Sequence, residues 1–330
     1  MNEIIYIFKS GRLARKDNTI YFENDGERKF IPVENTKEIH IFGEITLNKD
    51  ALEFLSQKEI ILHFYNYYEY YVGSFYPREH YNSGYITVSQ ARHYLDTNLR
   101  VSLAKKFVFG SISNMEKVVR YYNNRGVNLE NILANLRNLK DNLDSIVDIP
   151  TLLALEGKSR EIYYDSFNEI LKDSQFFMDK RTRRPPKDSI NALISFGNSL
   201  MYTTILSQIY KTHLDPRIGY LHESNFRSFS LNLDVSEIFK PIIVDRVIFS
   251  LVNRGVIGVD FFDKRLNGIY LSENGAKEFV KAFDERLNST ISHKTLGRNV
   301  SYRTLIRLEL YKIEKHIIGE KVYEPFISEW

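Results

Sequence analysis

The side chains best suited to chemistry lie between Gly219 and Pro241, in the stretch GYLHESNFRSFSLNLDVSEIFKP. It holds one histidine, His222, and a carboxylate pair, Asp234 and Glu237, spaced three residues apart. On a helix this spacing places both carboxylates on one face. With no cysteine in the chain, an imidazole and carboxylates would favour Mg²⁺ or Mn²⁺ over a zinc–thiolate site. The alternative is an ordinary core or surface histidine near two acids.

The sequence around this carboxylate pair predicts a short helix with a defined start and a break at its end. The apolar run SFSLNLDV approaches a helix start, and Asp234 occupies a position suited to an N-cap. Pro241 cannot donate to the carbonyl of Glu237, so the helix is expected to kink or restart there. Residues 242–252 are apolar on nearly every side, which predicts a buried helix. Rigid elements of this kind are what a metal site requires.

A third acid, Glu156, lies on a helix expected after Pro150. The apolar stripe of that helix runs through Leu152, Tyr163, Phe167 and Ile170. Glu156 falls inside the stripe, where a carboxylate must protonate or find a partner. One candidate partner is Arg160, four residues on. The other is a metal shared with His222 and Glu237, because bundles build such sites from facing helices.

The composition is that of a soluble globular protein large enough for two domains. The 330 residues are 43% hydrophobic and 26% charged, with no cysteine and hence no disulfide. No apolar run reaches membrane-spanning length, and the N-terminus MNEIIYIFKSGR lacks a signal-peptide layout. We therefore expect a cytoplasmic protein with no membrane partner.

Hydrophobic periodicity predicts an α+β protein. Residues 1–83 are expected to form a small β-rich domain, because the runs IIYIF, TIYFE, KFIPV and EIHIF are typical of strands. Asn24-Asp25-Gly26 predicts a hairpin, and Lys49 to Gln57 a helix capped by Asn48. A linker is expected from Pro77 to Gly84. Residues 84–330 show helical periods and are expected to form a larger all-helical catalytic domain, with one small hairpin in VIGVDFF…GIYLS.

Tyrosines are dense near the end of the first domain. They are Tyr65, Tyr67, Tyr68, Tyr70 and Tyr71. Such rings either stack on nucleic-acid bases or cover a sheet or an interface. We favour the second interpretation, which predicts that the β-rich domain is the surface of a homodimer.

Positive charge is concentrated in two segments. Residues 179–187 carry one acid and five bases, a sum of +4 against +3 for the whole chain: Lys180, Arg181, Arg183, Arg184 and Lys187. Charge concentrated in this way indicates a surface for an anionic partner, and like charges with little apolar surface to bury predict a loop that is poorly ordered without that partner. Residues 293–316 carry two acids and six bases: Lys294, Arg298, Arg303, Arg307, Lys312 and Lys315. For this second segment, DNA contact and a solvated helix face both stay open.

Taken together, three motifs resemble the CRISPR-associated integrase-nuclease family often called Cas one. They are an LEG glutamate at Glu156, a GYLH histidine at His222 after an Asp-Pro turn, and an acidic pair before a basic–Pro step. They occur in the family's order, and the resemblance extends over the whole chain. It implies that Glu156, His222 and Glu237 are metal ligands for Mg²⁺ or Mn²⁺. Asp234 would be an accessory catalytic acid.

The resemblance also implies the activity. Proteins of this family cut double-stranded and branched DNA and join 3′-hydroxyl ends of foreign DNA into a CRISPR array, a phosphoryl transfer. It further implies that the basic loop, residues 179–187, binds DNA phosphates, and that the protein has a small partner, the Cas-two protein. Lys240 stands where many relatives carry arginine, and we count it among the DNA contacts although it lacks arginine's bidentate fork.

Two other function classes remain open from the residues alone. One is a non-catalytic DNA-binding scaffold of the same fold, against which the intact Glu156, His222 and Glu237 argue. The other is an unrelated metal-dependent phosphoesterase. Clustered basic charge and the lack of a glycine-rich nucleotide loop argue against that class.

Overall fold

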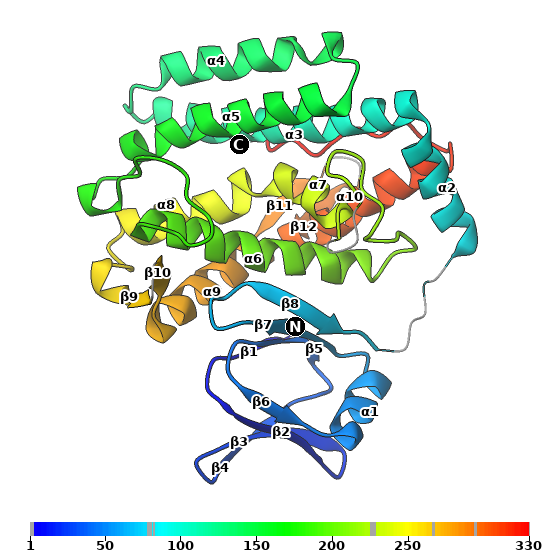
Figure 1. The fold of residues 1–330 in the computed structure, drawn as a ribbon, viewed down its shortest axis with the longest axis vertical. Coiled ribbons are helices and arrows are strands. Elements are labelled where there is room, and N and C mark those ends of the chain that lie inside the picture. The colour runs from blue at the N-terminus through cyan, green and yellow to red at the C-terminus, as the bar shows by residue number, and fades with distance from the viewer. Residues whose placement is uncertain are drawn as a thin grey trace. The chain divides into compact units, whose positions relative to one another are not determined.

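The computed structural model describes residues 3–77, 81, 83–224, 229–265, 268–293 and 296–329. The chain divides into two compact units, Met1–Asn82 and Ser83–Trp330. The predicted α+β class is confirmed, since strands dominate the first unit and helices the second (Figure 1). Parts of four predicted features lie outside the described residues: 78–80 and 82 of the linker, 225–228 of the histidine stretch, 266–267 of the predicted hairpin, and Lys294 of the second basic segment.

The first unit is built on two four-stranded sheets. One has the order β1-β5-β7-β8, with three parallel strands and an antiparallel edge: β1 (Glu3–Ile7), β5 (Thr36–Ile41), β7 (Ile61–Tyr65) and β8 (Tyr71–Phe75). The other has the order β4-β3-β2-β6: β2 (Gly11–Lys16), β3 (Thr19–Asn24), β4 (Glu27–Ile31) and β6 (Ile45–Leu47). Their apolar side chains form one core with helix α1 (Lys49–Gln57).

Local signals in this unit are confirmed. The side chain of Asn48 accepts a hydrogen bond from the backbone N–H of Ala51 at 3.0 Å, which caps α1 as predicted. Asp25 and Gly26 have φ angles of 49° and 82° and turn the chain between β3 and β4. This left-handed pair matches the twist of the flanking strands, so the predicted hairpin forms here.

The second unit is a helical assembly around a long central helix. Its helices are α2 (Gly84–Leu95), α3 (Thr97–Asn123), α4 (Glu130–Asp141), α5 (Ile149–Ile170), α6 (Ser189–Ile209), α7 (Leu231–Phe239), α8 (Arg246–Asn253), α9 (Glu273–Asn288) and α10 (Tyr302–Ile317). Helix α3 packs against α4, α5 and α7, and α7 also packs against α6. Figure 1 shows α3, α4 and α5 running alongside one another.

This unit is not purely helical, which corrects the all-helical expectation. Two antiparallel hairpins interrupt it: β9 (Phe262–Arg265) with β10 (Gly268–Leu271), and β11 (Thr290–His293) with β12 (Arg298–Ser301). The first is the predicted hairpin. The second was not predicted, because its strands TISH and RNVS are mostly polar and show no clear alternation of apolar and polar residues.

The helix carrying the acidic pair ends as predicted, but in a different form. After α7 the chain enters a π-helical turn, η3 (Pro241–Asp245), in which Asp245 donates to the carbonyl of Lys240 at 3.1 Å. Pro241 lacks the N–H that would continue the α-helical pattern. Helix α8 then follows. The apolar residues between Ile242 and Val252 are buried, while Arg246 is half-buried and Ser250 exposed, so the predicted core segment is confirmed for its apolar positions.

The expected N-cap role of Asp234 is wrong. Ser230 precedes α7, while Asp234 lies inside its first turn with a fully buried side chain. Among the described residues, no helix combines the length and the apolar character that crossing a bilayer requires.

Candidate active site

Glu156 lies on α5, and 13% of its side chain is exposed. The helix begins where Asp148 accepts a hydrogen bond from the N–H of Thr151 at 2.8 Å, with Pro150 in the first turn. The predicted apolar stripe is buried as expected: Leu152, Tyr163, Phe167 and Ile170. The carboxylate of Glu156 therefore faces the interior of the helical unit.

Arg160 joins three buried carboxylates. Its Nη2 contacts Oε2 of Glu237 at 2.6 Å, and its Nε lies 3.1 Å from the same oxygen. Its Nε lies 3.6 Å from Glu156 Oε1, and its Nη1 3.9 Å from Asp245 Oδ2. Arg160 therefore pairs mainly with Glu237 on α7 and more loosely with Glu156 on its own helix.

Lys240 is the second cation on Glu237. Its Nζ lies 2.5 Å from Glu237 Oε1 and 4.7 Å from the ring centre of Tyr202. Only 7% of its side chain is exposed. The predicted DNA-contact residue thus faces the buried acid rather than the protein surface.

His222 is held by Asp234. Its Nδ1 lies 2.8 Å from Asp234 Oδ1, and the same carboxylate accepts backbone N–H groups of Tyr220, Leu221 and His222 at 2.6, 3.1 and 2.9 Å. Burial lowers the pKa of His222, but the hydrogen bond to Asp234 and the negative charges of Asp234 and Glu237 together outweigh burial and raise the pKa overall. Gly219 permits this approach, because a Cβ there would come within 2.9 Å of Asp234 Oδ2.

The charges of these groups shift one another's pKa. Burial raises the pKa of Glu156, and the negative charge of Glu237 raises it further. Burial also acts to raise the pKa of Glu237, but Lys240 and Arg160 outweigh it and hold that pKa well below its usual range. His222 acts on both acids in the same direction, lowering their pKa values. The structure therefore gathers the three predicted ligands into one electrostatic cluster.

The described residues contain one group of three metal-ligating side chains whose ligand atoms all lie within 4.8 Å of one another. It is Glu38, His40 and His63, in the first unit. Glu156, His222 and Glu237 do not form such a compact group, and Arg160 and Lys240 both pair with Glu237. The compact group was not predicted from the sequence. Its signal was the alternation Glu38-x-His40 inside a strand, with His63 on another strand.

The basic loop, residues 179–187, is tied down, so the expectation of poor order is wrong. The Asn191 side chain accepts from the Thr182 N–H at 2.9 Å and from Arg181 Nη1 at 2.8 Å, and donates to the Lys180 carbonyl at 2.9 Å. Burial lowers the pKa of Arg181, which lies mostly inside. The other four bases are exposed: Lys180, Arg183, Arg184 and Lys187.

The second basic segment makes several intramolecular contacts. Arg303 Nη2 lies 3.3 Å from Asp284 Oδ1, and Lys312 Nζ lies 2.5 Å from Glu309 Oε2. Arg307 donates to the side chain of Gln208 at 3.0 Å. These partners favour a structural role for the three residues.

Asp245→Asn should stabilise the protein at neutral pH. Burial raises the pKa of Asp245 to about 6, despite Arg160, from an ordinary value of 3.8. Ionising Asp245 therefore weakens folding progressively as pH rises from 3.8 to about 6. Chemical denaturation should show asparagine raising the free energy of unfolding at pH 8 but not at pH 3.5. An equal change at both pH values would contradict this cause.

Relatives and solved structures match the chain along its whole length. "CRISPR-associated endonuclease Cas1 2" of Thermodesulfovibrio yellowstonii is 58% identical over 330 residues, covering 100% of both chains. "CRISPR-associated endonuclease Cas1" of Thermotoga maritima is 49% identical, covering 97% of this chain and 98% of the relative. The solved Cas1 structure from Thermotoga maritima superposes with a TM-score of 0.88 at 47% identity, covering 99% and 100%.

These matches define the class as a CRISPR-associated endonuclease. The family model described as "CRISPR associated protein Cas1" matches residues 5–285, so the chain belongs to the Cas1 family. The predicted family and enzyme class, an endonuclease of CRISPR adaptation, are thereby confirmed. A casposase bound to integration product superposes with a TM-score of 0.89 at 20% identity, covering 99% of this chain and 93% of that one, which shows a shared fold.

Proposed function

We propose that this protein is a metal-dependent DNA endonuclease and integrase, which joins 3′-hydroxyl ends of foreign DNA into a CRISPR array. The observation that carries the proposal is the cluster of two largely buried carboxylates, Glu156 and Glu237, with one fixed and partly exposed imidazole, His222. Membership of the Cas1 family supports the same activity and argues against an unrelated phosphoesterase.

The cluster fits Mg²⁺ or Mn²⁺. Burial and the charge of Glu237 raise the pKa of Glu156, so an added divalent cation would stabilise its ionised form. A carboxylate offers about four acceptor sites, so Glu237 keeps acceptor capacity beyond Arg160 and Lys240. Two oxygens and one nitrogen suit a hard or borderline ion. Held by Glu156, Glu237 and His222, such an ion would supply polarisation of a phosphodiester and compensation of developing negative charge.

The surrounding residues position these groups. Asp234 accepts from Nδ1 of His222 and so turns Nε2 toward any ligand. We assign Asp234 this positioning role within the predicted catalytic set. Arg160 and Lys240 hold Glu237 ionised and fix its orientation. No serine or tyrosine nucleophile is needed, because a DNA 3′-hydroxyl or water attacks the phosphorus directly.

The substrate would be held by sequence-independent contacts. The exposed bases Lys180, Arg183, Arg184 and Lys187 would bind phosphates of double-stranded and branched DNA. Lys240 would reach a phosphate only after leaving Glu237. Arg181 would act indirectly, by holding the loop through Asn191.

Two protein partners belong to the proposal. A homodimer through the β-rich unit is supported by exposed apolar groups near its edge strand β8, with Val72 66% and Tyr67 63% exposed. A Cas2 partner is suggested by a Cas6-RT-Cas1–Cas2 complex of the same fold, with a TM-score of 0.86 at 19% identity.

The proposal is tested by incubating branched DNA and labelled 3′-hydroxyl ends with the protein. Cleavage and covalent joining should require Mg²⁺ or Mn²⁺, disappear with EDTA, and be abolished in His222→Ala. If wild type binds DNA but neither cuts nor joins it with either ion, the protein is the non-catalytic scaffold. Unchanged cleavage in EDTA would remove the metal from the account.

The basic loop, residues 179–187, should contribute to the affinity for DNA rather than to the chemical step. Arg183→Ala with Arg184→Ala is expected to weaken binding of all DNA sequences and to lower the log–log salt slope by about one for each phosphate that is no longer bound. Turnover of fully bound DNA should change far less. A salt titration of affinity, paired with single-turnover cleavage at saturating protein, measures both effects.

A matched control removes equal charge elsewhere. Lys29→Ala with Lys49→Ala takes two exposed bases from the first unit. This pair should leave the salt slope near wild type. Cleavage abolished at saturation in the arginine pair, with an unchanged slope, would place those arginines in the active site instead.

A further inference from the structure

We propose that Glu38, His40 and His63 form a second metal site, separate from the catalytic cluster, which binds a borderline divalent ion such as Zn²⁺ and stabilises the β-rich unit. The proposal does not depend on the catalytic assignment. It rests on residues of β5 and β7 alone, which lie within one compact unit.

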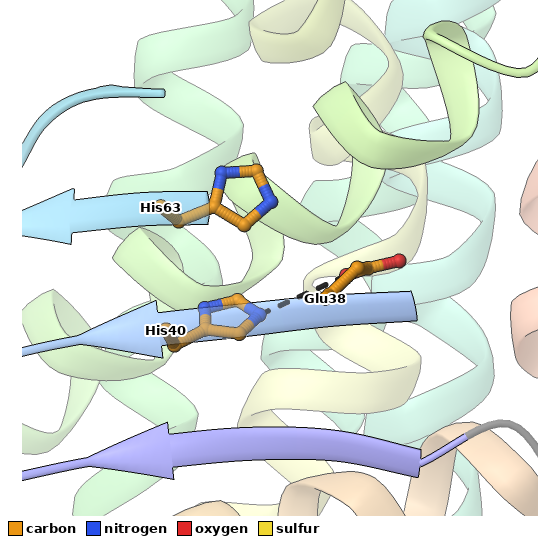
Figure 2. A group of neighbouring side chains, drawn as sticks. All are labelled: Glu38, His40 and His63. Atoms are coloured by element: carbon orange, nitrogen blue, oxygen red, sulfur yellow. Dashed lines mark ion pairs between the residues drawn. The ribbon is translucent and has the colours of Figure 1, made fainter. Parts of the chain in front are cut away.

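The sheet brings the three side chains together. Glu38 and His40 are two residues apart on β5, so they share one face. His63 on β7 lies opposite His40 in the parallel register. Figure 2 shows all three side chains grouped on these neighbouring strands. Their ligand atoms all lie within 4.8 Å of one another, and His40 Nε2 is 3.7 Å from Glu38 Oε2.

The three polar side chains are buried at positions where apolar side chains would cost less free energy on folding. The exposed fractions of Glu38, His40 and His63 are 2%, 2% and 0%. The Tyr6 ring stacks on His40 at 4.7 Å, and the Tyr65 ring lies at 5.8 Å. A buried carboxylate costs free energy unless it is paired or coordinates a metal. A bound cation would be a favourable neighbour for the Glu38 carboxylate.

Both imidazoles are oriented as metal ligands usually are. His40 Nδ1 lies 2.8 Å from the hydroxyl of Tyr65, and His63 Nδ1 lies 2.6 Å from that of Ser74. With the proton on Nδ1 donated to these hydroxyls, Nε2 is the atom that each ring would present to a metal. The hydroxyl of Tyr71 lies 2.9 Å from Ser74 Oγ and extends the network. Outer hydrogen bonds of this kind fix the tautomer of a ligating histidine.

The three ligand atoms of this site favour Zn²⁺. Two imidazole nitrogens and one carboxylate oxygen are ligands that Zn²⁺ takes, with a fourth position for water. The catalytic cluster has more oxygen and favours Mg²⁺ or Mn²⁺. The ion would tie the adjacent strands β5 and β7 together, so its effect should appear in stability rather than in turnover.

The test uses metal-stripped protein without a histidine tag. One equivalent of Zn²⁺ should be retained after gel filtration, by elemental analysis, and the melting temperature should rise until one equivalent is bound. The His222→Ala variant should behave the same, because the proposed site lacks His222. Tyr65→Phe removes the hydroxyl bonded to His40 but keeps its ring, and should weaken Zn²⁺ binding by about 10-fold or more.

Variants of the ligands need a safeguard against misfolding. His63→Gln should lose the bound Zn²⁺ while keeping DNA binding. If this variant fails to fold, the zinc measurements on the wild-type protein test the proposal without it. Wild-type crystals soaked in Zn²⁺ should then show anomalous density between Glu38, His40 and His63. No density there, no retained equivalent, or zinc lost in His222→Ala but kept in His63→Gln would overturn the proposal. A failure here would leave the catalytic test with Mn²⁺ unaffected.

Discussion

Glu156→Gln is expected to reduce metal-dependent cleavage and joining of DNA by about 10³-fold or more, since loss of a ligand removes several kcal/mol of charge stabilisation. The same change should leave the free energy of unfolding unchanged or higher. Burial and the charge of Glu237 both raise the pKa of Glu156, so its ionised form is a cost to the metal-free fold. Glutamine keeps the shape and removes the charge.

The measurement pairs single-turnover cleavage in Mn²⁺ with thermal and chemical unfolding. Glu161→Gln is the matched control, because Glu161 lies on the same helix, is 67% exposed and pairs with Lys158. It should change neither quantity. If Glu156→Gln cleaves DNA normally, or destabilises the protein as strongly as loss of Arg160, then Glu156 is a structural ion-pair residue.

Arg160→Ala is expected to destabilise the protein by about 3–5 kcal/mol, because it removes the cation that contacts Glu156 and Asp245 and leaves Glu237 with Lys240 alone. Arg160 contacts Glu237 at 2.6 Å and lies between Glu156 and Asp245. Adding Mn²⁺ should restore part of this loss, since the ion would replace the missing positive charge. Denaturant unfolding with and without Mn²⁺ measures both effects.

Lys158→Ala is the control for the loss of a cation. Lys158 is 56% exposed and pairs with Glu161 on the surface of α5. Exposed ion pairs contribute little to stability, so this variant should unfold close to wild type. Equal stability of Arg160→Ala and Lys158→Ala would show that the buried network is not needed for folding.

Glu156 had two possible partners from sequence alone, Arg160 or a shared metal. The structure shows that Arg160 does approach Glu156, at 3.6 Å, but makes its shorter contact with Glu237. The two alternatives are therefore not exclusive. One arginine holds two of the three proposed ligands in place.

What was predictable was local. Asn48 and the turn at Asp25 and Gly26 act through nearest neighbours, so composition and spacing located them correctly. The stripe that buries Glu156 follows from helical period alone. The order of the Glu156, His222 and Glu237 motifs identified the family, because their combination is specific.

What was missed depends on interactions between distant segments. Asp234 binds the backbone at residues 220–222 instead of capping its own helix. Asn191 orders the basic loop by accepting from Thr182, which no local pattern reveals. Glu38 and His63 lie close together only because β5 and β7 are neighbours in the sheet, and the sequence of neither strand specifies which strand pairs with it.

The central claim is that Glu156, His222 and Glu237 share one metal ion. A crystal structure after a Mn²⁺ soak, with anomalous data at the manganese edge, tests it most directly. The expected result is one peak, at about 2.0–2.6 Å from a carboxylate oxygen of Glu156, a carboxylate oxygen of Glu237 and the Nε2 atom of His222. Saturating Mn²⁺ with no peak among these three side chains, while Arg160 and Lys240 keep their contacts with Glu237, would contradict it.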